Sequence, residues 1–227
     1  MYCNLPTDVH GLIVGYLEVE EHRVLIMECG WEMRCLVPHA KYVEDTLWRY
    51  TPEIVGWVLQ NMEKVDPGVR DNQAIRWASE DGYPGALRLL LADPRTDPAR
   101  NNNWTIIFAS MCGDTEAVRI LLASPRTDPG ASNNRALSVA VEYGYAEIVK
   151  MLLADSRVDP TRGDNQSVRY AAMHGSTWST EVLQVLLADP RVDPSANNNE
   201  ALLYAVEHGH SRVVEILLAD SRVYPPL

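Results

Sequence analysis

The stretch Asp193–Val223, DPSANNNEALLYAVEHGHSRVVEILLADSRV, is the clearest copy of a unit that the chain repeats. Its opening Asp-Pro pair recurs upstream at Asp66, Asp97, Asp128 and Asp159. Successive pairs are separated by 31, 31, 31 and 34 residues. A fixed period in this range predicts a stacked array of helical units. One unit with two short amphipathic helices buries too little apolar surface to fold alone, so each needs its neighbours.

Five copies follow one another: Asp66–Thr96, Asp97–Thr127, Asp128–Val158, Asp159–Val192 and Asp193–Val223. Each contains a helix of the form Asn-x-x-apolar-x-x-Ala, then a glycine, then a second helix that ends in Leu-Leu or a close variant. The glycines stand where the first helix must stop and reverse, a left-handed position that glycine adopts without steric cost. They are Gly82, Gly113, Gly144, Gly175 and Gly209.

The unit resembles the ankyrin repeat over residues 66–223. The family's core leucine corresponds to Ile75, Ile106, Leu137, Val168 and Leu202, and its alanine to Ala78, Ala109, Ala140, Ala171 and Ala205. The resemblance implies an all-α ankyrin-repeat solenoid. The period is shorter than the family's, which implies shortened finger loops between repeats. Asparagine stands in place of the family's glycine before the first helix. Because asparagine accepts positive φ, we expect that backbone at Asn72, Asn103, Asn134, Asn165 and Asn199.

Residues 1–34 do not fit the repeat. Their pattern Leu-Pro-x-Asp-Val, then Ile, Tyr-Leu and a late Trp, resembles an F-box, a short helical module that docks on the adaptor subunit of cullin–RING ubiquitin ligases. The matching positions implied to bind that adaptor are Leu5, Pro6, Val9, Ile13, Leu17 and Trp31. The alternative is a pair of helices that only caps the array, because solenoids need atypical ends.

Residues 35–65 predict a degenerate ankyrin-like repeat. Its second helix is expected to open at Pro52, since proline is tolerated in the first turn of a helix. Ile54, Val55, Val58 and Leu59 then repeat the apolar spacing of the later second helices. The whole chain is therefore divided into an F-box-like helical module (1–34), a degenerate repeat (35–65), and five repeats with a short tail (66–227).

The formal charge of −11 argues against a nucleic-acid or anionic membrane partner, because no basic stripe is present to neutralise phosphates. No apolar run is long enough for a membrane span, and the start of the chain lacks the pattern of a secretion signal. Four cysteines do not make a disulfide framework, so we expect an intracellular, cytoplasmic or nuclear protein. No catalytic motif or close metal-ligand pair is found, so we expect neither an enzyme nor a cofactor or metal.

Two further series recur along the copies. Arginines stand two residues before each following Asp-Pro or its equivalent, and we expect them to bridge to aspartates and free carbonyls of neighbouring repeats; they are Arg95, Arg126, Arg157, Arg191 and Arg222. Large side chains follow the core position by two residues, and with this net charge we expect inter-repeat core there rather than base stacking. These are Trp77, Phe108, Val139, Tyr170 and Tyr204.

In ankyrin arrays, partners contact the fingers and the exposed edge of the first helix. The resemblance therefore implies that a protein partner binds a concave face made of Glu80, Asp81, Trp104, Met111, Cys112, Arg135, Glu142, Tyr143, Gln166, Met173, His174, Glu200, Glu207 and His208. Copies that otherwise agree differ at these positions, as expected of a surface that the fold does not dictate, although drift gives the same pattern. Trp104 is either a binding anchor or a cover for the neighbouring loop. Acidic residues around apolar ones suit a basic or amphipathic partner.

Three functional hypotheses follow for a non-enzymatic interaction protein. The first is a substrate receptor that couples a target to a cullin–RING ligase through the F-box-like segment. The second is a plain scaffold that sequesters or displaces a partner. The third is a structural protein that self-associates through its C-terminal repeat, where Leu203 is expected to be exposed. The Asp-Pro-Arg-Val-Asp-Pro connectors also resemble ankyrin arrays of large DNA viruses, which favours a viral protein acting on a host.

Overall fold

The computed structural model describes residues 52–61, 67–80, 82–175 and 177–223, and within these ranges every regular element is an α-helix. The chain divides into two compact units, residues 1–96 and 97–227. The predicted all-α solenoid is confirmed. The predicted division at residues 34 and 65 stays a prediction.

The first unit contributes α4 (Pro52–Asn61), α5 (Val69–Glu80) and α6 (Pro84–Ala92). A helix opening at Pro52 is therefore confirmed, and its Val55 is fully buried. Two glycines let α4 and α6 approach closely: a Cβ on Gly85 would lie 2.5 Å from the Pro52 ring, and one on Gly56 would lie 3.4 Å from Leu89. α6 also packs on α5.

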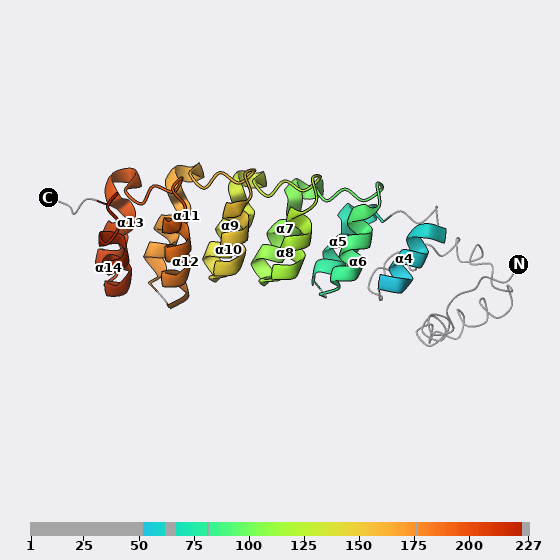
Figure 1. Ribbon diagram of the computed structural model, residues 1–227, viewed down its shortest axis with the longest axis horizontal. Helices are drawn as coiled ribbons and strands as arrows, with labels where there is room; N and C mark the ends of the chain where they lie inside the picture. Colours follow the sequence, from blue (N-terminus) through green and yellow to red (C-terminus); the bar gives the residue numbers. More distant parts are fainter. Residues whose placement is uncertain (1–51, 62–66, 81, 176, 224–227) are drawn as a thin grey trace, which may run out of the picture. The chain divides into compact units, whose positions relative to one another are not determined.

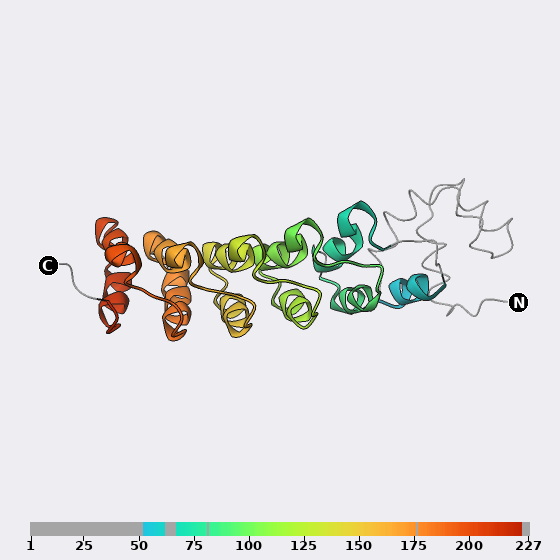
Figure 2. The same ribbon diagram turned by 90° about the horizontal axis from the view of Figure 1, so that it is seen from above.

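The second unit contains four helix pairs, from α7 to α14, which lie in a row (Figures 1 and 2). The first helices are α7 (Arg100–Cys112), α9 (Ala131–Tyr143), α11 (Arg162–His174) and α13 (Ala196–Glu207). The second helices are α8 (Thr115–Leu122), α10 (Ala146–Ala154), α12 (Thr177–Ala188) and α14 (Ser211–Leu218). Each first helix packs on the next first helix, and each second helix on the next second helix. The two rows therefore form the layers of a solenoid.

The core lies between these two rows. The apolar residues expected to repeat in the second helices are fully buried where they face the first helices, as at Leu121, Leu152, Leu186 and Leu217. The small residue in each first helix is buried too, at Ala109, Ala140, Ala171 and Ala205. Small side chains at this position let adjacent helices approach. The core that the periodicity predicts is confirmed.

Each first helix of this unit begins with left-handed backbone. In the turn Asn101–Asn103 the φ angles are 52°, 56° and 60°, and the turns Ser132–Asn134 and Asn197–Asn199 have φ between 53° and 61°. The positive φ predicted for the last asparagine of each turn is confirmed, with Asn165 at 57° and Asn72 of the first unit at 60°. The two left-handed residues before it were not predicted, since left-handed residues normally occur singly.

The last asparagine of the turn also ties one repeat to the next. Asn103 Oδ1 accepts a hydrogen bond from the backbone N–H of Asp128 (2.7 Å), and Asn165 Oδ1 accepts one from Asp193 (2.8 Å). Asn134 instead turns its Nδ2 toward the carbonyl of Asp159, to which it donates. A glycine would accept the same φ but could not form this bridge, which explains why asparagine stands here.

The connectors between repeats contain no β-strand in residues 123–130, 155–161 and 189–195. The absence of a β-hairpin in these connectors agrees with the predicted shortening of the finger loops. The aspartate of each Asp-Pro pair braces the tight turn that follows. Its Oδ1 accepts the N–H two residues on, at 3.0 Å for Asp97, 2.9 Å for Asp128 and 2.9 Å for Asp193. Such side-chain-to-backbone turns favour aspartate.

Arginines join consecutive repeats, as predicted. The Arg157 guanidinium pairs with Asp155 at 2.6 Å and donates to the carbonyls of Thr127 (2.6 Å) and Leu122 (2.8 Å) in the preceding repeat. Arg191 and Arg222 make equivalent contacts. The aspartate in the pair precedes the arginine by two residues, so it is not the aspartate of the following Asp-Pro. The Leu122 carbonyl lies at the end of α8, where acceptors lack helical partners, and the Thr127 carbonyl lies in the connector that follows.

The predicted glycine positions are left-handed in both units, with φ from 56° to 80° at Gly82, Gly113, Gly144, Gly175 and Gly209. Two of them are also covered by a ring from the next repeat. A Cβ on Gly113 would lie 2.6 Å from the Tyr145 ring, and one on Gly175 would lie 2.0 Å from the His210 ring. At those two positions both the backbone and the available space require glycine.

The F-box-like positions lie outside the described residues, as does most of the degenerate repeat. These positions are Leu5, Pro6, Val9, Ile13, Leu17 and Trp31. Their predicted roles stay predictions. Among the described residues, no helix has both the length and the apolar character that crossing a membrane demands.

Candidate functional site

The exposed side of the first helices in the second unit is the candidate binding surface, called here the first-helix edge. Regular helix begins at the residue after the last asparagine of each left-handed turn. At 100° per residue, the first, fifth and eighth helical residues share one face. In α7 these are Trp104, Phe108 and Met111.

Trp104 is 40% exposed and leans on Phe108, with ring centroids 6.3 Å apart and planes tilted by 43°. Phe108 and Met111 are half-buried on the same face of α7. This pair of rings presents an apolar surface of the size that commonly anchors protein interfaces, where tryptophan and tyrosine are enriched. Cys112 follows as an exposed cysteine at the end of the helix.

Aromatic side chains continue along the next two first helices. Tyr143 is 51% exposed at the end of α9 and stacks on Tyr145, with centroids 6.3 Å apart. On α11, Tyr170 contacts His174 at 4.4 Å between ring centroids. Burial raises the pKa of Tyr170, and the nearby Glu142 raises it further. The first-helix edge is therefore aromatic, with a carboxylate beside it.

Glu200, at the start of the regular part of α13, is held by its own neighbours. Its carboxylate accepts hydrogen bonds from Arg169, from Asn197 (3.1 Å) and from the Tyr204 hydroxyl (2.9 Å). The bond from Arg169, followed by those from Asn197 and Tyr204, lowers the pKa of Glu200 to about 2. Because Arg169 lies on α11, the pair joins two consecutive repeats. Glu200 is therefore a carboxylate with its charge already balanced.

Two histidines close the end of this edge. His208 donates from Nδ1 to the carbonyl of Tyr204 at 2.9 Å. Its ring stacks on that of His210, with 5.8 Å between the ring centroids. His210 Nε2 lies 2.8 Å from the carbonyl of Met173. A carbonyl can only accept, so this nitrogen carries the proton. His208 is exposed, whereas the His210 ring covers Gly175.

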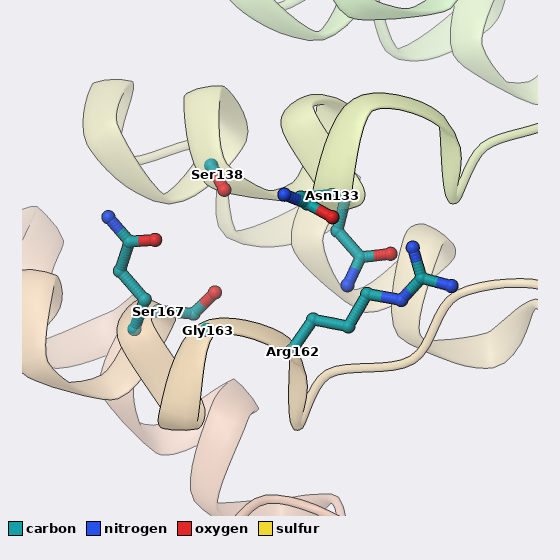
Figure 3. Close-up of a pocket in the computed structure, with 7 residues that line it drawn as sticks. Asn133, Ser138, Arg162, Gly163 and Ser167 are labelled. Carbon is teal, nitrogen blue, oxygen red and sulfur yellow. The ribbon is translucent and has the colours of Figure 1, made fainter.

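A polar hollow of about 310 Å³ lies between α9 and α11 (Figure 3). Ser138 and Asn133 face it from the side of α9, and Arg162, Gly163 and Ser167 from the side of α11 (Figure 3). The remaining lining residues are Asn134 and Gln166. Among the side chains that the structure describes, its lining carries one cation and no carboxylate.

A family model for ankyrin repeats, three copies long, matches residues 75–164 and 137–225. The chain belongs to the ankyrin-repeat family. The matched residues cover both the left-handed turns and the first helices described above. No curated protein matches the chain in sequence. Ankyrin repeats are protein–protein interaction modules. The family therefore supports the prediction of an interaction protein, without naming a partner.

The predicted partner-binding residues of this ankyrin array differ in how accessible they are. The exposed ones are Glu80 in the first unit and Trp104, Cys112, Arg135, Tyr143, Gln166, His174, Glu207 and His208 in the second. The half-buried ones are Met111, Glu142, Met173 and Glu200. Asp81 lies outside the described residues. Their role in binding a partner stays a prediction, and no group of three potential metal ligands occurs among the described residues.

Sequence reasoning missed the polar hollow. Its signal was present as two departures from the ankyrin repeat: Ser138 stands where the neighbouring copies carry Ile107, Arg169 and Leu203, and Gly163 stands where they carry Asn101, Ser132 and Asn197. Both departures remove side-chain volume. To predict a hollow from these two residues, one must already know how α9 packs against α11.

Proposed function

We propose that this protein is a binding scaffold whose first-helix edge holds a protein partner. The observation that carries the proposal is the exposure of Trp104 and Tyr143 in repeats whose other large apolar side chains are mostly buried. Aromatic side chains exposed on a rigid helical support lose little conformational entropy on binding, which makes them good anchors.

The partner's chemistry is inferred from the charges on the same edge. Glu142 on this edge is half-buried and Glu207 is exposed. The charge of Glu200, in contrast, is balanced by its ion pair with Arg169. The chain as a whole carries −11. A basic or amphipathic segment therefore suits the edge, with its apolar side against Trp104 and its cations toward the acidic residues.

The test is affinity purification from the native cell with intact protein and with Trp104→Gln, since Gln166 is the residue that another copy carries at this position. Lys150→Gln, on the exposed side of α10, is the matched control. A partner of the first-helix edge should be lost with Trp104→Gln and retained with Lys150→Gln. If Trp104 only covers a loop, the Trp104→Gln protein will retain every partner and lose stability instead.

A second proposal concerns the F-box-like segment and rests on its residues alone. The pattern that includes Leu5, Pro6 and Val9 supports a substrate receptor of a cullin–RING ligase. A pull-down with the ligase adaptor, using intact protein and Leu5→Ala/Pro6→Ala, tests it. Adaptor binding by the intact protein alone supports the receptor. If the intact protein binds no adaptor, the segment acts as a cap and the receptor proposal fails.

Self-association through the last described repeat is a third proposal. Val206 is 59% exposed, whereas the residues at the same position in the preceding repeats, Ser110, Val141 and Ala172, are fully buried. Leu203 and Leu218 are exposed as well. Exposed apolar patches favour association. A solution mass that rises with concentration, and falls back to monomer with Val206→Glu, supports it; a monomer at high concentration counts against it. The viral style of the connectors stays a prediction.

A further inference from the structure

The hollow between α9 and α11 is encoded by the sequence of these two repeats. Ser138 stands at the position where the preceding repeat carries the buried Ile107. A side chain of that size at position 138 would fill the hollow. Gly163 provides the left-handed backbone of the turn (φ 63°) without a side chain. The result is a cavity of about 310 Å³ beside the first-helix edge, large enough for one side chain of a partner.

Two acceptor atoms of the lining are already engaged or closed off. The carbonyl of Gly163 accepts a hydrogen bond from Arg169 Nη2 at 3.0 Å. Asn134 donates from Nδ2 to the carbonyl of Asp159, and its Oδ1 has no contact with solvent. Neither atom is therefore presented to a ligand.

The other lining side chains offer hydroxyls and amides, which can donate as well as accept, and one guanidinium, which can only donate. Ser138 and Ser167 carry hydroxyls, Asn133 and Gln166 carry amides, and Arg162 carries the only charge among the described lining side chains. The Arg162 guanidinium lies 4.0 Å from Asp159, and both side chains are at least half exposed. An exposed ion pair at this distance contributes little to stability. A second carboxylate can therefore replace Asp159 beside the Arg162 guanidinium or share the guanidinium with it. Guanidinium and hydroxyl groups together are the usual donors to a carboxylate.

We propose that this hollow binds the carboxylate of an aspartate or glutamate side chain from the partner. The proposal rests on the proposed function, since it assigns one residue of the partner that the first-helix edge binds. An acidic side chain is disfavoured on the rest of a protein that carries −11, so this single site would fix the register of an otherwise basic segment.

The test uses the full chain and a blocked tripeptide, so it needs no protein partner. The probe is acetyl-Ala-Glu-Ala-N-methylamide, compared with the Gln and Lys peptides and with inorganic phosphate at constant ionic strength. Amide chemical shifts of Ser138, Gly163 and Ser167 are followed by ¹⁵N–¹H NMR. We expect saturable shifts with the Glu peptide, about 5- to 10-fold weaker binding of the Gln peptide, and none of the Lys peptide.

Three variants make the test specific. Arg162→Gln should weaken binding of the Glu peptide about 10-fold. Arg100→Gln, at the equivalent position two repeats earlier, should leave it unchanged. Ser138→Ile should abolish it by filling the hollow with the residue that the preceding repeat carries as Ile107. Unchanged circular dichroism and urea midpoint show that each variant folds; Arg162→Gln, an exposed change, keeps the test decisive if Ser138→Ile does not fold.

The proposal is overturned if no peptide gives saturable shifts, if the Gln or Lys peptide binds as well as the Glu peptide, or if Ser138→Ile leaves binding intact. Tighter binding of phosphate than of the Glu peptide, lost with Arg162→Gln, would assign the site to a free oxyanion instead and would equally overturn it. Loss of partner capture with Trp104→Gln is a separate result, so failure of this site and failure of the proposed function are distinguishable.

Discussion

Replacing Asn103 separates the two roles that the structure gives it. Its backbone is left-handed (φ 60°), and its Oδ1 accepts a hydrogen bond from Asp128 at 2.7 Å. Asn103→Ala loses both. A left-handed alanine costs about 1–2 kcal/mol, and loss of the hydrogen bond costs about 0.5–1.5 kcal/mol. Because asparagine itself bears part of the left-handed strain, we expect a total destabilisation of about 1.5–3 kcal/mol.

Asn103→Gly removes only the hydrogen bond, since glycine accepts this φ. We expect it to cost about 1 kcal/mol or less. Asn102 is the matched position: it has φ 56°, is exposed, and its side chain has no hydrogen bond to a described residue. Asn102→Ala should therefore show only the backbone cost, about 1 kcal/mol, and Asn102→Gly should show no loss.

Urea unfolding followed by circular dichroism at 222 nm measures these differences. With a slope of about 2 kcal/mol/M, Asn103→Ala should lower the midpoint by about 1 M and Asn103→Gly by about half that or less. The slope must stay constant, because repeat arrays can lose cooperativity. Equal destabilisation by Asn103→Ala and Asn103→Gly, together with no effect of Asn102→Ala, would refute the left-handed turn.

Four further outcomes are expected. Ser132 is left-handed without being asparagine (φ 53°), so Ser132→Gly should raise the urea midpoint, by about 1 kcal/mol in free energy of unfolding; a lower midpoint would contradict that conformation. Gly175→Ala should cost more than Gly209→Ala, because a Cβ meets the His210 ring at 2.0 Å in the first case and nothing within 4 Å in the second; equal midpoints would show that His210 does not cover Gly175. The hydrogen bond from Arg157, and the equivalent bonds from Arg191 and Arg222, lower the pKa of Asp155, Asp189 and Asp220 below 3.8. The stability that these aspartates contribute is complete above the unfolded pKa near 3.8 and is lost as pH falls through the lower folded pKa. Urea midpoints measured from pH 7 to 2 should therefore fall below about pH 4, and they should fall less in Asp155→Asn. Identical pH profiles of the two proteins would show that Asp155 does not contribute. Arg157→Ala should lower the midpoint more than Arg119→Ala, since Arg157 reaches the carbonyls of the preceding repeat whereas Arg119 only pairs with Glu116 on its own helix; equal effects would mean that the arginine series does not join repeats.

The repeat period and the apolar spacing were enough to predict the solenoid, because packing of one unit on the next follows from residues that recur at fixed positions. The last asparagine of each turn, such as Asn103, was predicted to be left-handed from its residue type. The two residues before it were not, since nothing in local propensity favours three left-handed residues in succession. Its bridge to Asp128 was also missed, because it joins residues 25 positions apart.

The candidate site was predicted less completely than the fold. Exposure of Trp104 and Tyr143 followed from their places in the repeat, as did the acidic character of the edge. The neutralisation of Glu200 by Arg169 did not, because it depends on how α11 and α13 pack. The hollow at Ser138 depends on the same kind of packing between α9 and α11. Contacts between repeats thus decide which exposed residues remain available to a partner.

Quantitative recovery of partners by intact protein, Trp104→Gln and Lys150→Gln, after cross-linking in the native cell, tests the central claim most directly. The first-helix edge predicts at least one protein whose recovery falls about 10-fold or more with Trp104→Gln, since truncation of a central aromatic anchor commonly costs 2 kcal/mol or more, and stays unchanged with Lys150→Gln. Equal recovery of every partner by all three folded proteins would contradict it.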